Sequence, residues 1–398
     1  MSISIFINYM KKNGFKKTVF KCIEKIYVGI NPVFVKHCPF KIKENKIVFS
    51  NFNGKGYGYD PKYICEELLK IGGYDLVWAV KDKHVNNGVP DGVRTVRKNS
   101  ARFYYDMATA KIWVDDVRKG YEVVKRPGQY YMQTWHGSIP LKKIENDAIQ
   151  SLSDNYINDA KHDSELIDVI LSSCKTRSIL IKRAFWYDGD ILEIGCPRND
   201  IFFHKEKNKL ELFKDLGVDG NKRIAVYAPT FRQDESIEAY NLDFDEVKKA
   251  LKQKFGEEYI WVVRLHPNLE GIDVKATFGE DIIDGSKIQD AQWLFANSNV
   301  LISDYSDCLF ETAFAGIPVF IYASDIKSYI KERDFYISLD KLPFSISQNT
   351  QELVNTILSF DEEDYLESLN KFWNAQGLFE NGTATKKAVS WIINKIKE

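Results

Sequence analysis

The sequence predicts an α/β protein made of two doubly wound halves, each a parallel sheet covered by helices on both faces. Three observations lead to this fold class: the chain length, the alternation of strand-like and helix-like segments, and the composition of the strands. At 398 residues the chain exceeds the size at which one hydrophobic core stops growing. Its strand-like segments are near-continuous apolar runs, which is expected when helices bury both faces of a sheet.

The alternation is regular in both halves. In the first half, strand-like and helix-like stretches follow one another at 46–52, 60–72, 74–80, 100–110 and 111–116. In the second half, helix-like stretches separate strand-like runs at 189–195, 222–230, 259–267, 299–304 and 317–323. Strand, helix, strand is the rhythm of a parallel sheet.

A helical region at 153–188 marks the expected boundary between the halves. The predicted organisation is a basic amphipathic segment at 1–45, a first Rossmann-like half at 46–185, a second at 186–360, and helices at 361–398 that cross back to the first half. Ligands in such folds bind beyond the carboxyl ends of the strands, so the cleft between the halves is the expected site.

Charge and cysteine content exclude several classes of protein. The 55 Lys and Arg residues nearly balance the 56 Asp and Glu residues, which argues against a nucleic-acid binder with a uniformly basic surface. The six cysteines form no CxxC pair and no zinc-ligand spacing, so we expect reduced thiols in a cytoplasmic protein. No apolar run reaches the ~18 residues that a membrane span needs.

The N-terminal segment is the most asymmetric part of the chain. Between residues 1 and 36, seven lysines accompany a single acid, Glu24, among interleaved Ile, Phe, Val and Tyr residues. Such a segment either lies in a membrane interface or packs on its own domain with its lysines in water, and composition alone favours neither reading.

Two of the six histidines stand at the carboxyl ends of expected strands, one in each half. His136 follows the run "QYYMQTW" and precedes Gly137, whereas His266 ends the run "YIWVVRL". Histidine exchanges a proton near neutral pH, so a cleft that joins both residues suits general acid/base chemistry. The alternative reading is that each histidine only caps a strand end or bonds a loop carbonyl.

Loops of the second half carry groups that suit a diphosphate. A helix is expected to start at about Asp307 with Ser306 as its N-cap, and the free N–H groups of a helix start attract phosphate. Thr230, Arg232 and Arg198 also follow strands, and arginine binds phosphate with two parallel hydrogen bonds. Each feature alone is also compatible with ordinary capping or a solvated arginine.

The first half lacks a dinucleotide signature. Its glycine-rich loop at 50–64 has neither the full GxGxxG spacing nor the acidic residue expected ~20 positions later, so we reject a nicotinamide site. An acceptor-binding loop is the alternative. Lys55 and Lys62, with Lys142 and Lys143 beyond His136, would give this half local positive charge.

Five ordered motifs carry a resemblance to a known family: "QTWHGSIPLKK", "GCPRND", "YAPTFR", "RLHP" and "SDYSDCLFETAFAG". From about residue 46 to 322 the chain closely resembles the CDP-glycerol glycerophosphotransferase family, which comprises the teichoic-acid primases and polymerases of Gram-positive bacteria and their capsule-making relatives. The resemblance implies a GT-B fold and a peripheral position on the cytoplasmic face of the cell membrane. It favours the membrane-interface reading of the N-terminal segment.

The resemblance also implies roles for individual residues. His136 matches the family's general base, and Gly137 would permit close approach of the acceptor. His266 matches a histidine that contacts the donor diphosphate, and its implied catalytic role is to stabilise charge on the leaving group. The remaining donor-side positions are Arg198, Thr230, Arg232, Arg264 and Ser306. Two positions depart from the usual pattern: Asp307 replaces a serine, and Glu311 replaces an aspartate. The transferred unit therefore stays open between glycerol, ribitol and another alditol phosphate.

The implied reaction is transfer of an alditol phosphate from a CDP-alditol to a hydroxyl of a lipid-linked or polymeric acceptor, with release of CMP. Mg²⁺ stays open as a cofactor, although no Asp/Glu cluster of the DxD kind stands out as a metal site. Two rivals remain: a GT-B glycosyltransferase that uses a nucleotide sugar, and a non-catalytic scaffold on the membrane surface. Primase or polymerase activity, the teichoic-acid or capsule pathway, and self-assembly into a homo-oligomer are left undecided.

Overall fold

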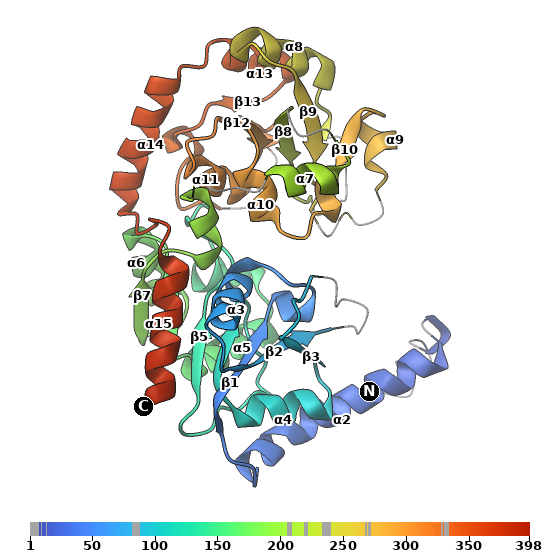
Figure 1. Ribbon diagram of the computed structural model, residues 1–398, viewed down its shortest axis with the longest axis vertical. Helices are drawn as coiled ribbons and strands as arrows, with labels where there is room; N and C mark the ends of the chain where they lie inside the picture. The colour runs from blue at the N-terminus through green and yellow to red at the C-terminus, as the bar shows by residue number, and fades with distance from the viewer. Residues whose placement is uncertain are drawn as a thin grey trace.

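The computed structural model describes residues 8, 10–12, 14–81, 88–204, 209–218, 222–232, 240–266, 269, 272–327, 329 and 334–398. The chain forms two α/β domains, the first below and the second above in Figure 1, each built on a parallel sheet. The carboxyl ends of strands in both sheets lead into loops at the junction of the domains. This arrangement confirms the fold class that the sequence predicts.

The first sheet has seven strands in the order β3-β2-β1-β4-β5-β6-β7. They are β1 (Lys43–Ser50), β2 (Asp75–Val80), β3 (Arg94–Arg97), β4 (Ala110–Asp115), β5 (Tyr130–Gln133), β6 (Val169–Ser172) and β7 (Asp190–Glu193). All neighbouring pairs are parallel. The central strand β4 is buried along its whole length, as its apolar sequence requires.

The second sheet has six strands in the order β10-β9-β8-β11-β12-β13, again all parallel. They are β8 (Arg223–Ala228), β9 (Tyr259–Val263), β10 (Ile282–Asp284), β11 (Val300–Ser303), β12 (Val319–Tyr322) and β13 (Ile346–Ser347). In both sheets the strand order reverses beside a central strand, which is the doubly wound pattern.

The expected boundary at residues 185–186 is displaced. The region predicted to be helical contains β6 between α5 (Asp154–Leu166) and α6 (Lys175–Ala184). β7, which the sequence placed in the second half, pairs with β6 and extends the first sheet. A four-residue apolar run between two helices cannot be distinguished from a helical segment by periodicity, which explains the error.

The helices cover the sheets. Besides α5 and α6 they include α2 (Phe15–Lys36), α3 (Tyr59–Ile71), α4 (Ala101–Thr109), α7 (Lys209–Leu216), α8 (Phe244–Phe255), α9 (Val274–Phe278), α10 (Ala291–Ala296), α11 (Cys308–Ala313), α13 (Thr350–Leu358), α14 (Glu362–Gln376) and α15 (Ala384–Lys397). Short 3₁₀ turns include η1 (Phe52–Gly54) and η4 (Pro197–Phe202).

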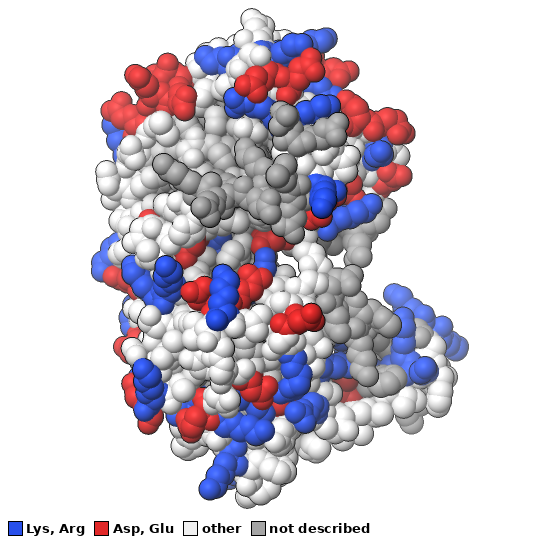
Figure 2. Space-filling view, in the orientation of Figure 1, with Lys and Arg blue, Asp and Glu red and all other residues white. Residues whose placement is uncertain are grey.

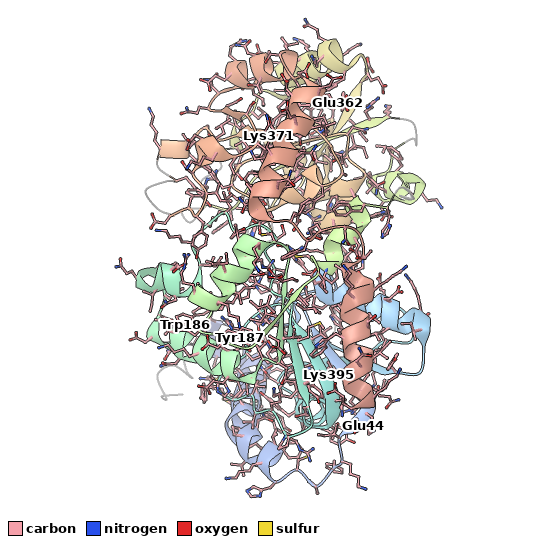
Figure 3. All side chains as sticks on the ribbon, turned by 90° about the vertical axis from the view of Figure 1, so that its left-hand side faces the viewer. Glu44, Trp186, Tyr187, Glu362, Lys371 and Lys395 are labelled. Atoms are coloured by element: carbon pink, nitrogen blue, oxygen red, sulfur yellow. The ribbon has the colours of Figure 1, made fainter. Side chains whose placement is uncertain are left out.

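The last two helices connect the domains. Glu362 and Lys371 mark α14 beside the second domain, and Lys395 marks α15 beside the first (Figure 3). Ala388 and Ile392 of α15 are fully buried in the same core cluster as Ile47 of β1 and Ile112 of β4. The C-terminal helix thus packs against the first sheet although its chain arrives from the second domain.

Helix α2 packs on the first domain along one side. Glu24 pairs with Arg97 at 2.7 Å, and the Asn31 amide donates to the backbone oxygen of Glu122 at 2.7 Å. Among the described residues, no helix is both long and apolar enough to cross a membrane.

Asp200 in η4 fixes the start of α15. Its carboxylate accepts hydrogen bonds from the backbone N–H groups of Ala384 (2.9 Å) and Thr385 (2.8 Å), which have no partner within their own helix. The Thr383 side chain makes no capping hydrogen bond. A carboxylate from a segment 184 residues earlier therefore takes the place of a local cap.

We expect Asp200→Ala to lower the free energy of unfolding by about 1–2 kcal/mol, because two N–H groups at a buried helix start lose their acceptor. Urea titration followed by circular dichroism measures the change. Asp188→Ala, at an exposed aspartate before β7, is the matched control and should stay within about 0.5 kcal/mol of the parent chain. Equal stability of the Asp200→Ala and Asp188→Ala variants would contradict the capping role.

Candidate active site

His136 lies in a turn directly after β5, at the carboxyl edge of the first sheet. Its Nδ1 lies 2.8 Å from the backbone oxygen of Asp116. Because a carbonyl oxygen only accepts hydrogen bonds, Nδ1 carries the proton and Nε2 keeps its lone pair. Asp116 is held in turn by donors from Asn51 and Phe52. The imidazole is therefore fixed in the tautomer that a general base requires.

The surroundings of His136 keep it uncharged. Trp135 stacks on the imidazole with ring centroids 4.5 Å apart, and Phe52 lies 5.3 Å away. Burial lowers the pKa of His136 to about 4, and the nearby guanidinium charges of Arg198 and Arg177 contribute to the shift. An anion bound beside the ring would raise this pKa toward neutrality, because it would favour the imidazolium.

Arg177 on α6 stabilises the His136 turn through hydrogen bonds to its backbone oxygens. It is 4% exposed and donates to the backbone oxygen of Gly137, and at 3.3 Å to those of Ser138 and Thr134. Sequence reasoning missed this residue. Its partners are backbone atoms of a loop about 40 residues earlier, and nothing in the sequence pattern marks them.

Gly137 brings the two domains into contact. A Cβ atom at this position would lie 2.9 Å from Oδ2 of Asp307, which directly precedes α11 in the second domain. A side chain here would push the carboxylate away, so the glycine permits the close approach. Burial and the neighbouring Glu311 raise the pKa of Asp307 to about 6.

Arg198 joins both domains at the centre of the junction. Its side chain is fully buried and forms ion pairs with Asp60 on α3 and Glu311 on α11. It also donates to the backbone oxygen of His136 at 3.3 Å. Burial opposes the charge, but the two carboxylates raise the pKa of Arg198 well above its usual value. Instead of presenting an open guanidinium to a phosphate, Arg198 connects three segments from two domains.

The rest of the "GCPRND" loop is equally well anchored. Glu380, between α14 and α15, accepts hydrogen bonds from the Cys196 N–H (3.0 Å) and the Asn199 amide (2.7 Å). Burial raises the pKa of Glu380 to about 8, so its carboxyl group is mainly protonated at neutral pH. Together with the contacts of Arg198 and Asp200, these hydrogen bonds anchor residues 195–200 to both domains and to the start of α15. We call this buried cluster the hub.

Thr230 and Arg232 form a second internal network. The Thr230 N–H and hydroxyl donate to the carboxylate of Asp304 at 2.9 and 3.0 Å. Arg232 pairs with Asp304 at 2.8 Å and with Asp325, and its guanidinium lies over the Tyr305 ring. The arginine is 6% exposed. Its charge is balanced within the domain, so Arg232 shapes the strand-end loops.

Arg264 and His266 follow β9 and have different surroundings. The Arg264 side chain donates to the backbone oxygens of Gly285 (2.7 Å) and Ile288 (2.5 Å), and among the described residues no carboxylate forms an ion pair with it. Burial lowers the pKa of Arg264. Burial also lowers the pKa of His266, with smaller effects from Lys142 and Lys55 of the first domain. Arg264 thus supplies a guanidinium at the end of β9, whereas the lowered pKa of His266 favours its neutral form.

The turn before α11 differs in detail from the expectation. The helix begins at Cys308, and the Ser306 hydroxyl accepts only a long bond of 3.4 Å from the Cys308 N–H. Glu311 is 3% exposed and receives Arg198 on one oxygen and the Gln292 amide, at 3.0 Å, on the other. Ser306 and Asp307 therefore line the domain junction, whereas Glu311 lies within the hub.

The four lysines expected on the acceptor side separate into different settings. Lys62 pairs with Asp290 of the second domain, and Lys143 pairs with Asp334 at 3.0 Å. Lys55 is exposed near His266, and Lys142 lies over the Tyr329 ring at 5.3 Å. Among the described residues, no group of three or more His, Cys, Asp or Glu side chains has the arrangement of metal ligands.

Residues 32–394 match the family described as CDP-Glycerol:Poly(glycerophosphate) glycerophosphotransferase. The chain belongs to this family. It is 32% identical over 398 residues to a teichoic acid glycerol-phosphate transferase of Staphylococcus aureus, covering 95% of this chain and 99% of the relative. It is 30% identical over 377 residues to a teichoic acid poly(glycerol phosphate) polymerase of Staphylococcus epidermidis, covering 90% of this chain and 52% of that relative. The chain thus spans about half the length of that polymerase.

The structure of this glycerophosphotransferase family member resembles the wall teichoic acid polymerase TagF, solved after a soak with CDPG. The TM-score is 0.82 at 29% identity, over 96% of each chain. The two parallel-sheet domains therefore form a GT-B fold.

The sequence motifs of this family member mark two kinds of residue. One set follows strand ends or lies at the domain junction, and among the described residues no ion pair is formed by its members: His136, Gly137, Lys142, Arg264, Ser306 and Asp307. His266 follows β9 in the same region. Arg198, Glu311, Thr230 and Arg232 are engaged inside the protein, because carboxylate, guanidinium and backbone partners already surround them. We infer that these internally paired residues hold the residues of the first set in position.

We expect Arg198→Ala to lower the free energy of unfolding by about 3–5 kcal/mol, because it leaves Asp60 and Glu311 buried without their partner. Arg183→Ala is the matched control, since Arg183 also pairs with a carboxylate, Asp147, but is 58% exposed. This control should lose less than about 1 kcal/mol. Urea unfolding of both variants measures the difference. A stable Arg198→Ala variant that lost only donor affinity would instead make Arg198 a phosphate ligand.

Proposed function

We propose that this protein transfers an alditol phosphate, with glycerol phosphate as the favoured unit, from a CDP-alditol to a hydroxyl of a lipid-linked or polymeric acceptor. CMP is the second product, and the polymer is a teichoic acid or a capsular polysaccharide. One observation carries the proposal: His136, in a fixed neutral tautomer, lies at the junction where Gly137 contacts the second domain. Membership of the glycerophosphotransferase family supports the same reaction.

In the proposed mechanism His136 acts as general base. The acceptor hydroxyl gives its proton to Nε2, and its oxygen forms a bond to the β-phosphorus of the CDP-alditol. The bond from that phosphorus to the bridging oxygen breaks, and its electron pair leaves with CMP. The Asp116 carbonyl, which accepts from Nδ1–H at 2.8 Å, stabilises the imidazolium that forms.

Charge stabilisation comes from the second domain. Arg264 offers a guanidinium without a carboxylate partner among the described residues, and His266 follows the same strand. Transfer of a phosphoryl group leaves little covalent work for the protein, so orientation and positive charge account for most of the catalysis. The Ser306 hydroxyl adds a neutral donor at the same turn as Asp307.

The test of this function is the release of CMP when the protein is mixed with CDP-glycerol or CDP-ribitol and a lipid-linked or capsule-type acceptor. A nucleotide-sugar glycosyltransferase would release a nucleoside diphosphate instead, and a non-catalytic scaffold would release neither.

We expect His136→Asn to lower kcat by about 10²- to 10⁴-fold with little change in affinity for the CDP-alditol. The loss of turnover in this variant should therefore exceed any loss of donor binding.

The wild-type pH profile offers a second check of the general base. The base works only when neutral, so activity falls as the pH drops through the pKa of His136. The pKa of about 4 governs kcat/KM, which reports the free enzyme. The bound anion raises this pKa, so the acid limb of kcat should lie at higher pH. Equal losses of binding and turnover would contradict the base assignment.

We further infer that α2 holds the protein against the inner face of the cell membrane. The helix exposes an apolar row on one face, made of Phe15, Val19, Ile23, Ile26, Ile30 and Val33. Its spacing of three and four residues follows the helical repeat. Exposed lysines such as Lys16, Lys21 and Lys25 flank this row, and blue and white surface lie side by side over α2 at the lower right of Figure 2. An apolar face with basic flanks suits anionic lipid headgroups.

We expect the double variant Ile26→Glu/Ile30→Glu to lose most of its co-sedimentation with vesicles that contain phosphatidylglycerol, because two carboxylates cannot enter the apolar boundary. Ile71→Glu is the matched control, since Ile71 is 52% exposed at the end of α3 and lies outside α2. The control should pellet like the parent chain. Unchanged pelleting of the double variant would exclude α2 as the contact.

A further inference from the structure

Lys142 and Lys143 are neighbours in sequence but point to different surroundings. The segment that carries them runs antiparallel to residues 334–336 of the second domain: Lys142 is bridged to Phe335, the Lys143 N–H donates to the Asp334 oxygen at 2.9 Å, and the Tyr336 N–H donates to the Leu141 oxygen at 2.8 Å. Successive side chains of an extended segment point to opposite sides. Backbone pairing across the domains therefore sends the two ammonium groups in opposite directions.

Lys143 has its partner, Asp334, at 3.0 Å on the exposed side of this pairing. Lys142 has no ion-pair partner among the described residues. Its Nζ instead lies 5.3 Å from the centre of the Tyr329 ring, and Tyr329 stacks on Tyr305 with centroids 3.8 Å apart. Tyr305 directly precedes Ser306. The ammonium group of Lys142 thus packs on the second domain, against a tyrosine that stacks on the residue before Ser306.

Two titratable groups of the second domain respond to the charge of Lys142. Its charge contributes to the lowered pKa of His266, and it opposes the raised pKa of Asp307. His266, Asp307 and Tyr329 all belong to the second domain. Lys142 therefore belongs to the first domain, but these three neighbours of its ammonium group belong to the second domain.

We propose that Lys142 binds the diphosphate of the CDP-alditol donor, rather than attracting the acceptor chain as the sequence alone indicates. This assignment rests on the proposed function. The ligand chemistry is a non-bridging phosphate oxygen, which an ammonium group without a carboxylate partner favours. The donor is favoured over an acceptor phosphate because the Lys142 ammonium group lies over the Tyr329 ring of the second domain, and its charge acts on His266 and Asp307 of that domain.

This role gives the backbone pairing at 141–144 a function. The proposed donor site then takes positive charge from both domains: Arg264 from the second, and Lys142 from residues 141–143 of the first. Binding of the donor would then hold the domains together at the point where Gly137 already meets Asp307. The anion would also lie between Lys142 and His266, so it would favour the protonated form of His266.

The test compares Lys142→Met with Lys143→Met, its matched neighbour, in a full-length His136→Asn background that prevents turnover. Methionine keeps most of the side-chain length and removes the charge. Isothermal titration calorimetry measures the Kd for CDP-glycerol and for cytidine, which lacks phosphate. We expect Lys142→Met to weaken CDP-glycerol binding by about tenfold or more, the size of one charge-assisted hydrogen bond, and to leave cytidine binding unchanged. Lys143→Met should keep the donor affinity of the background chain.

Two further measurements separate the outcomes. By NMR, Lys142→Met should raise the pKa of His266, because a neighbouring positive charge is removed. In chains that keep His136, a rise in the acceptor KM with unchanged donor Kd would overturn the proposal and assign Lys142 to the acceptor. If the wild-type chain neither binds CDP-glycerol nor releases CMP, the proposed function itself fails. If it does both and the lysine variants bind the donor equally, only the role of Lys142 fails.

Discussion

The buried ion pairs of Arg198 are the constraint on which the junction depends. A fully buried guanidinium is stable only when carboxylates compensate the loss of water, and here one carboxylate comes from each domain. The same arginine donates to the His136 backbone. The separation of the sheets, the position of the His136 turn and the orientation of α11 are therefore coupled, since movement of any of them would leave a buried charge without its partner.

This coupling separates two kinds of cationic residue. Some are paired with carboxylates inside the protein, and others keep a charge that a ligand could use. Arg198 and Arg232 are neutralised by internal carboxylates and remain rigid, which suits residues that set geometry. Arg264 and Lys142 have no such partner among the described residues, so a bound anion would improve their electrostatic environment. In the proposed donor site, a few cations without ion-pair partners would meet the diphosphate, and the paired arginines would hold them in place.

The sequence predicts the fold class because the fold depends on local patterns, and the same patterns place the candidate site residues after strand ends. Apolar runs reveal most strands, and residues after strand ends must gather at one edge of a parallel sheet. The roles of the arginines were less predictable. Asp60 and Arg198 are 138 residues apart, and a loop arginine that grips phosphate has the same sequence context as one that pairs across domains. The sequence did not predict β6, because four apolar residues between two helices are too few to show whether their repeat is that of a strand or of a helix.

The carboxyl group of Asp307, which approaches Gly137 across the domain junction, affects the charge balance of the proposed site. A carboxylate beside a diphosphate is unfavourable, yet Asp307 lies within the electrostatic reach of Lys142 and already has a pKa of about 6. An arriving anion would raise that pKa further, so the donor and a proton on Asp307 favour each other. Once protonated, the carboxyl group can donate a hydrogen bond, as a serine hydroxyl would. The aspartate that departs from the family pattern is therefore compatible with the same donor chemistry, provided that Lys142 supplies positive charge across the junction.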